Sequence, residues 1–212
     1  MEFEKLILLL ENRLRLPLPG KEAHLQMAPH PINLKRFDPN LPSNHRKSGV
    51  LLLFYPIEGL AYFPLIKRPQ YPGVHGGQVA LPGGKMDPED LNVIQTALRE
   101  AEEEIGVSRS TIEVLGQMSD LYIPASNFLV SPTVGFVSSV PDFVPEVKEV
   151  DRIISFSLSG FMDENIRKQT LLDLGSGIRL DTPYFAIDGE IVWGATAMIL
   201  NELSRILEDH PL

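Results

Sequence analysis

The 212-residue chain contains no cysteine, an excess of acidic over basic residues and no long apolar segment. Without cysteine, the chain has no disulfide bonds, thiolate zinc ligands or cysteine nucleophile. Lys and Arg number 19 against 28 Asp and Glu, giving a formal net charge of -9. This charge disfavours a partner bound mainly through phosphate neutralisation, such as extended nucleic acid. No apolar run approaches the roughly 20 residues of a membrane span, so we expect no membrane partner.

The residues that are present are typical of a globular protein. Hydrophobic residues make up 43% of the chain and charged residues 22%, which excludes the disordered and fibrous classes. The length predicts one domain over residues 1–212, beginning with a helix and a long loop that extends to about residue 48. Because residues 1–13 mix acidic and polar residues with apolar ones, they do not resemble a signal peptide, and we expect a cytoplasmic protein. The sequence leaves open whether it is a monomer or a homodimer.

Apolar spacing predicts helices near both ends of the chain and strands between them. The first helix begins near Phe3 and ends before Pro17, and the last helix covers residues 195–207. Residues 50–55 and 61–67 form a predicted β-hairpin. Other predicted strands are residues 78–81, 113–118, 131–137, 153–158 and 184–192.

A central helix is predicted over residues 88–105, directly after a turn at residues 82–84. Asp87 suits the N-cap and Pro88 suits the first helical position. Gly106 is expected to end the helix as its C-terminal cap. Strand, glycine turn and capped helix thus form one predicted unit.

Three carboxylates lie on one face of this helix, opposite its apolar stripe. Glu100, Glu103 and Glu104 are spaced i, i+3 and i+4, so they repel one another by about 0.2–0.5 kcal/mol per pair. Carboxylates in a last turn also oppose the helix dipole. Mg²⁺ or Mn²⁺ bound by these oxygens would remove both penalties. A solvated acidic face is the alternative, but Gly83 and Gly84 upstream allow a ligand to approach the backbone closely and favour a site.

Gly84 and residues 99–107 together resemble the signature of the Nudix hydrolases. That signature reads Gly, five residues, Glu, seven residues, and then Arg-Glu-apolar-any-Glu-Glu-any-Gly-apolar. The second half matches at every specified position, whereas the first half is one residue longer and has Asp90 where the family usually has Glu. We expect Asp90 to support the start of the helix rather than to act near the site.

Residues 67–69 and 75–84 are similar to the additional motif of the Nudix subfamily that hydrolyses coenzyme A. The long N-terminal loop and residues 193–197 also resemble that subfamily, so the resemblance covers most of the chain. The departure is at Pro69 and at Pro72-Gly73, where subfamily members often carry Ser and a Leu-Arg pair. Hydrolysis of ADP-ribose or another nucleoside diphosphate derivative therefore remains an alternative. A non-catalytic nucleotide-binding module is a second alternative, and a purely structural protein is the weakest.

The resemblance implies a fold, a reaction and a set of site residues. The fold is an α/β/α sandwich around a mixed β-sheet, which agrees with the predicted order of elements. The reaction is metal-dependent hydrolysis of the pyrophosphate bond of coenzyme A to 3',5'-ADP and 4'-phosphopantetheine. The implied Mg²⁺ or Mn²⁺ ligands are Glu100, Glu103 and Glu104. The implied catalytic residues are Glu103, Arg99, Glu146 and Glu149, and the implied substrate-binding residues are Arg68, His75, Gly83 and Gly84.

Several of these assignments have a structural alternative. Glu146 and Glu149 are candidates for the general base or members of a solvated loop, and His75 either binds phosphate or stabilises its loop by a hydrogen bond. We expect Trp193 to anchor the core rather than to contact ligand. Aromatic residues of the N-terminal loop or near Tyr122 are candidates to stack on adenine.

Overall fold

Strand β1 (Arg46–Ile57) organises the main sheet of the protein. The computed structural model describes residues 1–70, 76–173 and 179–208. β1 pairs antiparallel with β2 (Leu60–Lys67) and β4 (Gly83–Lys85), and parallel with β7 (Phe128–Phe136). The predicted hairpin is therefore confirmed, and the parallel pair makes the sheet mixed.

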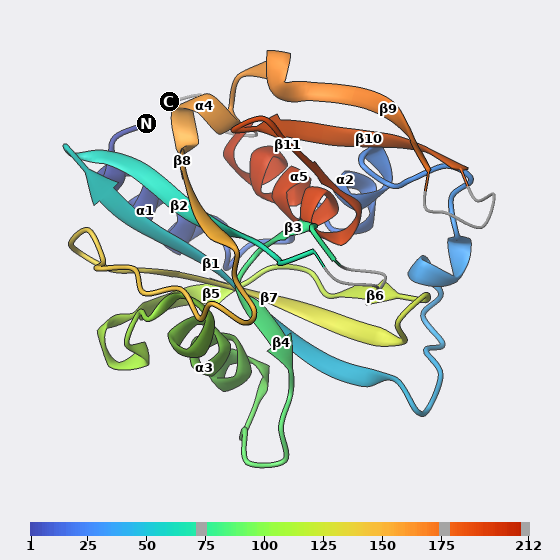
Figure 1. Cartoon of the computed structure of the whole chain (residues 1–212), viewed down its shortest axis with the longest axis horizontal. Helices are drawn as coiled ribbons and strands as arrows, with labels where there is room; N and C mark the ends of the chain where they lie inside the picture. Colours follow the sequence, from blue (N-terminus) through green and yellow to red (C-terminus); the bar gives the residue numbers. More distant parts are fainter. Residues whose placement is uncertain (71–75, 174–178, 209–212) are drawn as a thin grey trace.

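The described residues contain a second, smaller sheet (Figure 1). The main sheet has the order β3-β2-β1-β7-β5, with β4 on β1, β6 on β7 and β8 on β2, and the second has the order β11-β10-β9. The remaining strands are β3 (Val79–Ala80), β5 (Glu113–Gln117), β6 (Leu121–Ile123), β8 (Arg152–Ser157), β9 (Arg167–Asp173), β10 (Arg179–Ile187) and β11 (Glu190–Trp193).

Helices cover both faces of the main sheet. In Figure 1, α3 lies on one side of it, and α1, α2 and α5 lie on the other with the second sheet. The α-helices are α1 (Phe3–Arg13), α2 (Lys21–Gln26), α3 (Val93–Ile105), α4 (Leu158–Phe161) and α5 (Gly194–Glu208). Short 3-10 turns are η1 (Leu34–Phe37), η2 (Arg109–Thr111) and η3 (Glu164–Ile166). The expected α/β fold with a mixed sheet is confirmed.

Side chains that alternate along β1 build a core on each face of the sheet. Leu51 and Leu53 pack with Ala97 and Ala101 of α3, whereas Leu52 packs with residues of α1, α5 and the second sheet. This period of two is the geometry of a strand buried on both faces. β1 is therefore held from both sides, and the α3 layer is positioned directly against it.

The predicted central helix begins later than expected. Asn92, not Asp87, is the N-cap, and its side chain accepts a hydrogen bond from the Gln95 amide at 3.0 Å. The amide of Asp87 instead donates to the Asp90 carboxylate at 3.0 Å. Residues 88–92 therefore form a turn ahead of the helix, and the C-terminal cap at Gly106 is confirmed by its left-handed backbone, φ 74°.

Other differences arise where long-range pairing decides the structure. The predicted turn at residues 82–84 leads into β4, because Gly83 and Gly84 pair with β1. The predicted strand at residues 184–192 is two strands, since Asp188 and Gly189 turn the chain back with positive φ angles of 51° and 78°. α2, β6 and β9 were not expected from the spacing. Among the described residues, no helix is both long and apolar enough to cross a bilayer.

Candidate active site

Glu104 is a buried carboxylate in the last turn of α3. It is 1% exposed and accepts hydrogen bonds from the Gly83 amide at 2.7 Å and from Arg68 Nη2 at 3.1 Å. Burial raises the pKa of Glu104 to about 7, against the opposing effect of Arg68 and the Gly83 amide. The charges of Glu100 and Glu149 contribute to this rise. Glu104 thus ties α3 to β4 and carries negative charge that its neighbours do not fully offset.

Glu100, one turn earlier on α3, lies directly over Gly84. A Cβ added to Gly84 would come within 2.4 Å of the Glu100 carboxylate, so the helix and β4 approach this closely only because residue 84 lacks a side chain. Burial raises the pKa of Glu100, Arg99 lowers it, and Glu103 and Glu149 add to the rise. Glu100 and Glu104 therefore both lie against the two glycines, Glu100 at Gly84 and Glu104 at Gly83.

Glu103 has a different environment from the two other carboxylates of the predicted metal site. Its side chain is 58% exposed and receives a hydrogen bond from Arg99 Nη1 at 2.9 Å. The same nitrogen lies 2.9 Å from Glu100 Oε1. The three carboxylates share one helix face, but the expectation that this whole face lies opposite the core is wrong, because Glu104 is buried against β4.

Arg99 is held in place by Asp90. Arg99 Nε and Nη2 donate to the two Asp90 carboxylate oxygens at 3.1 and 3.0 Å, and Nη2 also donates to the Lys85 carbonyl. The Arg99 side chain lowers the pKa of Asp90 to about 2, and Thr96 Oγ1 also donates to Asp90. Asp90 thus contacts the start of the helix through the Asp87 amide and Thr96, but the expectation that it has no part near the site is wrong. Asp90 orients the arginine that contacts Glu100 and Glu103.

The carboxylates suit a hard divalent cation by their chemistry. Glu100, Glu103 and Glu104 offer only oxygen donors, which Mg²⁺ and Mn²⁺ prefer. Burial and mutual repulsion raise the pKa values of Glu100 and Glu104, so a nearby positive charge would favour their ionised forms. Within residues 1–70, 76–173 and 179–208, however, no three His, Cys, Asp or Glu side chains are arranged to hold a metal ion. Arg99 instead lies between Glu100 and Glu103.

The loop before β8 brings one of the two later glutamates near this cluster. The Glu146 amide donates to the Glu104 carbonyl at 3.0 Å, which fixes the loop against the end of α3. The charge of Glu149 raises the pKa values of both Glu100 and Glu104. The Glu146 carboxylate instead accepts from the Lys148 amide at 3.2 Å within its own loop. Of the two, Glu149 is the residue electrostatically coupled to the acidic cluster.

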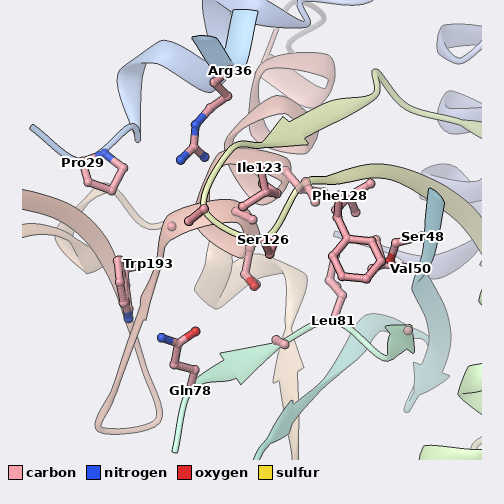
Figure 2. A pocket seen from close by; sticks show the side chains of 18 of the residues that line it. Pro29, Arg36, Ser48, Val50, Gln78, Leu81, Ile123, Ser126, Phe128 and Trp193 are labelled. Carbon is pink, nitrogen blue, oxygen red and sulfur yellow. The ribbon is translucent and has the colours of Figure 1, made fainter. Parts of the chain in front are cut away.

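A cavity of about 590 Å³ adjoins the glycine turn. Gly83, Gly84 and Arg68 line it, which places three of the predicted substrate-binding residues together. The fourth, His75, lies outside the described residues. Most of the other wall residues are apolar, as Figure 2 shows for Val50, Leu81, Ile123 and Phe128. Such a concave, largely apolar site with a few polar groups is typical of a small-molecule site.

The aromatic predictions fit this cavity only in part. Trp193 lines it and is partly exposed (Figure 2), so the expectation of a core anchor is wrong. Tyr122 is 6% exposed, donates to Asn127 at 2.7 Å and does not line this cavity. Phe128 and Arg36 also line the cavity and were not predicted. Neither residue belongs to a local motif, so only the fold could identify them.

Comparison with known proteins identifies a family and similar relatives. The model described as the NUDIX domain matches residues 46–155, just over half of the chain. A Yersinia enterocolitica protein named "Uncharacterized Nudix hydrolase NudL" is 36% identical over 142 residues, covering 66% of this chain and 71% of the relative. A Yersinia pestis protein of the same name is 31% identical over 185 residues, 84% of this chain and 87% of the relative.

Two solved structures have a similar fold. A Nudix hydrolase from M. smegmatis, RenU, has a TM-score of 0.55 and 17% sequence identity, over 79% of this chain and 89% of that chain. A MutT/nudix family protein from Enterococcus faecalis has a TM-score of 0.52 and 14% identity, over 81% and 65% of the two chains. At this identity the likeness concerns the fold alone.

Proposed function

Because the chain belongs to the Nudix hydrolase family, we propose that it hydrolyses the pyrophosphate bond of coenzyme A or an acyl derivative with Mg²⁺ or Mn²⁺. The observation that carries the proposal is the placement of Glu100 and Glu104 against the glycine turn at the edge of the 590 Å³ cavity. Ligand cavities typically measure about 300–1,000 Å³, so it accommodates part of a nucleotide-type substrate. Among such substrates coenzyme A is favoured because residues 67–69 and 75–84 are similar to the additional motif of the Nudix subfamily that hydrolyses it.

In this proposal the acidic face of α3 is the metal site. Glu100, Glu103 and Glu104 would hold the cation, which would supply positive charge beside the diphosphate and lower the pKa of nearby water. Glu104 is fixed by the Gly83 amide and Arg68, and Glu100 is fixed over Gly84. Pre-oriented carboxylates need little reorganisation when they bind a ligand, which favours catalysis.

Arg99 and Arg68 orient groups on the two sides of the cluster. Arg99 contacts Glu100 and Glu103 while Asp90 holds its guanidinium group. Arg68 contacts Glu104 and lines the cavity, so its remaining N–H groups are placed to bind a diphosphate oxygen. Gly83 and Gly84 line the cavity, and their lack of side chains lets β1 and the Glu100 carboxylate pack closely against β4 beside the substrate.

Glu149 is the proposed proton acceptor. The attacking water oxygen forms a bond to one phosphorus, the P–O bond of the pyrophosphate breaks, and the water proton passes to a carboxylate. The products are two phosphate monoesters, 3',5'-ADP and 4'-phosphopantetheine or its acyl form. Glu149 is favoured over Glu146 because its charge raises the pKa values of Glu100 and Glu104, whereas the Glu146 carboxylate accepts from the Lys148 amide within its own loop. We expect Glu149→Gln to lower kcat and change the pH profile more than Glu146→Gln.

The test is hydrolysis of coenzyme A, ADP-ribose and a dinucleotide polyphosphate side by side. Each substrate is incubated with Mg²⁺, with Mn²⁺ and with a chelator, and the products are identified by mass. We expect coenzyme A to be hydrolysed faster than the other two substrates. Its products, 3',5'-ADP and 4'-phosphopantetheine, should form only when metal is present. Faster hydrolysis of ADP-ribose or the dinucleotide would contradict the substrate assignment. Nucleotide binding without turnover of any substrate would contradict catalysis and favour a binding module.

A further inference from the structure

Arg36 is a cation at the wall of the cavity, in the N-terminal segment that precedes β1. It belongs to η1 (Leu34–Phe37), and Figure 2 shows its guanidinium group pointing into the cavity near Pro29 and Ile123. Trp193 and Gln78 lie on other parts of the same wall. The segment therefore adds a positive charge to a wall that is mostly apolar.

Arg36 forms no ion pair with a carboxylate in the described part of the chain. Its Nη1 donates to Met198 Sδ at 3.0 Å, a weak acceptor. Burial lowers the pKa of Arg36, and no described acidic group opposes that effect. Asp38, two residues later, uses a carboxylate oxygen to accept the Asn40 amide and forms no ion pair with Arg36 in the described part of the chain. A partly desolvated cation without an anion is unfavourable, so this wall favours an anionic ligand group.

The rest of the cavity indicates which anion Arg36 would meet. Arg68 and Lys85 line the wall beside Gly83 and Gly84, where the proposed function places the diphosphate. In Figure 2, Arg36 lies on the other side of the cavity from Leu81, which leads into Gly83 and Gly84, so Arg36 is placed to meet an anionic group other than the cleaved diphosphate. The rest of the wall is mostly apolar and includes Trp193, which suits a nucleoside.

On the basis of the proposed function, we propose that Arg36 binds the 3'-phosphate of the adenosine half of a coenzyme A-type substrate and sets specificity for it. A guanidinium group matches a phosphate by two parallel N–H···O bonds, whereas a Lys ammonium acts as a point charge. ADP-ribose and dephospho-coenzyme A lack this phosphate. Arg36 therefore distinguishes substrates that share the same diphosphate and the same adenosine.

The experiment compares coenzyme A with dephospho-coenzyme A as substrates of wild type, Arg36→Gln and Lys35→Gln. Lys35 is the matched control because it is an exposed cation on the same turn and does not line the cavity. We expect Arg36→Gln to lower kcat/KM for coenzyme A by about 10- to 100-fold, mainly through KM, as for a charged hydrogen bond made equally in ground and transition states. The kcat/KM of Arg36→Gln for dephospho-coenzyme A should stay within about 2-fold of the wild-type value. The kcat/KM of Lys35→Gln for both substrates should also stay within about 2-fold of wild type.

An equal loss on both substrates, or no loss on either, would overturn the inference. Binding of 3',5'-ADP and 5'-AMP, measured by calorimetry, tests it without turnover. Wild type should prefer 3',5'-ADP by about 10-fold or more, and Arg36→Gln should lose that preference. If wild type hydrolyses neither coenzyme A nor its dephospho form, the proposed function fails, and the calorimetric preference still decides the role of Arg36. Equal thermal unfolding midpoints for wild type and Arg36→Gln would show that the variant is folded. Arg36→Lys should keep part of the preference for 3',5'-ADP over 5'-AMP.

Discussion

The two ends of the cavity are assembled from the chain in different ways. The carboxylate end is formed by Gly83 and Gly84 of β4, which line the cavity, and by Glu104 and Glu100 of α3, which contact these glycines without lining the cavity themselves. β4 and α3 are close in sequence. The other end combines Arg36 from the N-terminal segment with Trp193 from the end of β11. The first end is a local motif whose carboxylates contact arginines, Glu104 with Arg68 and Glu100 with Arg99. The second exists only once distant segments have folded together, and its cation has no carboxylate partner among the described residues.

Neighbouring glutamates within the carboxylate end differ just as strongly. Glu104 is buried and its pKa is raised to about 7, whereas the Glu103 side chain is 58% exposed and paired with Arg99. Their positions on the helix differ by one residue, or about 100° of rotation. One carboxylate therefore faces β4 and the other faces solvent. The comparison implies that the inner glutamate contributes more to the site than the outer one.

Replacing Glu104, the buried glutamate, should have the largest effect on kcat. Glu104→Gln keeps the size of the side chain but removes its negative charge, and we expect kcat to fall by about 10³-fold or more, as for loss of a metal ligand. Glu103→Gln should lower kcat less. Glu102→Gln is the matched control on the same helix, since Glu102 pairs with Arg109 rather than with the cluster. Steady-state kinetics at saturating Mg²⁺ measures all three, and a larger loss in Glu103→Gln would reverse the comparison.

A methyl group at the glycine turn should have an intermediate effect. The Cβ of Gly84→Ala would lie 2.4 Å from the Glu100 carboxylate, at the end of a side chain that can rotate away. We expect the fold to persist and kcat/KM to fall by about 10- to 100-fold, as when the support of a metal ligand is removed. A thermal melt checks the fold and kinetics check the site. Wild-type activity in Gly84→Ala would show that the position of Glu100 over the turn is unimportant.

Replacing Asp90, which holds Arg99, should have the smallest effect. This effect is on the free energy of unfolding, and it should depend on pH. The pKa of Asp90 is about 2 in the folded protein, below its ordinary 3.8, so its ionised form stabilises the fold above pH 3.8 and this contribution is lost as pH falls toward 2. We expect Asp90→Asn to lower the free energy of unfolding by about 1–2 kcal/mol at pH 7.

Urea titrations at several pH values measure this dependence. The difference between wild type and Asp90→Asn should shrink below pH 4. Asp87→Asn is the control, because Asp87 is 58% exposed and lies 3.8 Å from Arg99, and it should cost less than about 0.5 kcal/mol. A difference that is the same at pH 2 and pH 7, or one that grows on acidification, would contradict the role given to Asp90.

The sequence predicts the parts of the protein that depend on local spacing. Glu100 and Glu104 meet the glycine turn because helix periodicity places them on one face, and Gly106 caps the helix because a left-handed residue is needed there. The start of α3 is missed because Asp87 and Asn92 are both good caps. In the structure Asn92 caps the helix, and Asp90, between the two candidates, contacts Arg99. Local propensity does not contain that contact.

Features built from distant segments are not predictable in this way. Trp193 is a large aromatic residue of the kind often found in a core. Its place on the cavity wall depends on β11 lying beside β3. Arg36 lies in a polar, proline-containing loop without periodicity, so nothing in its neighbours marks it as different from Lys35. Both residues gain their significance from tertiary packing.

The most direct test of the account is a calorimetric titration of Mn²⁺ into the wild-type protein, Glu104→Gln and Glu102→Gln. If the acidic face of α3 is a metal site, wild type and Glu102→Gln should bind Mn²⁺ saturably with equal affinity, and Glu104→Gln should bind at least about 10-fold more weakly. Equal affinity in wild type and Glu104→Gln, or no saturable binding by wild type, would contradict the central claim.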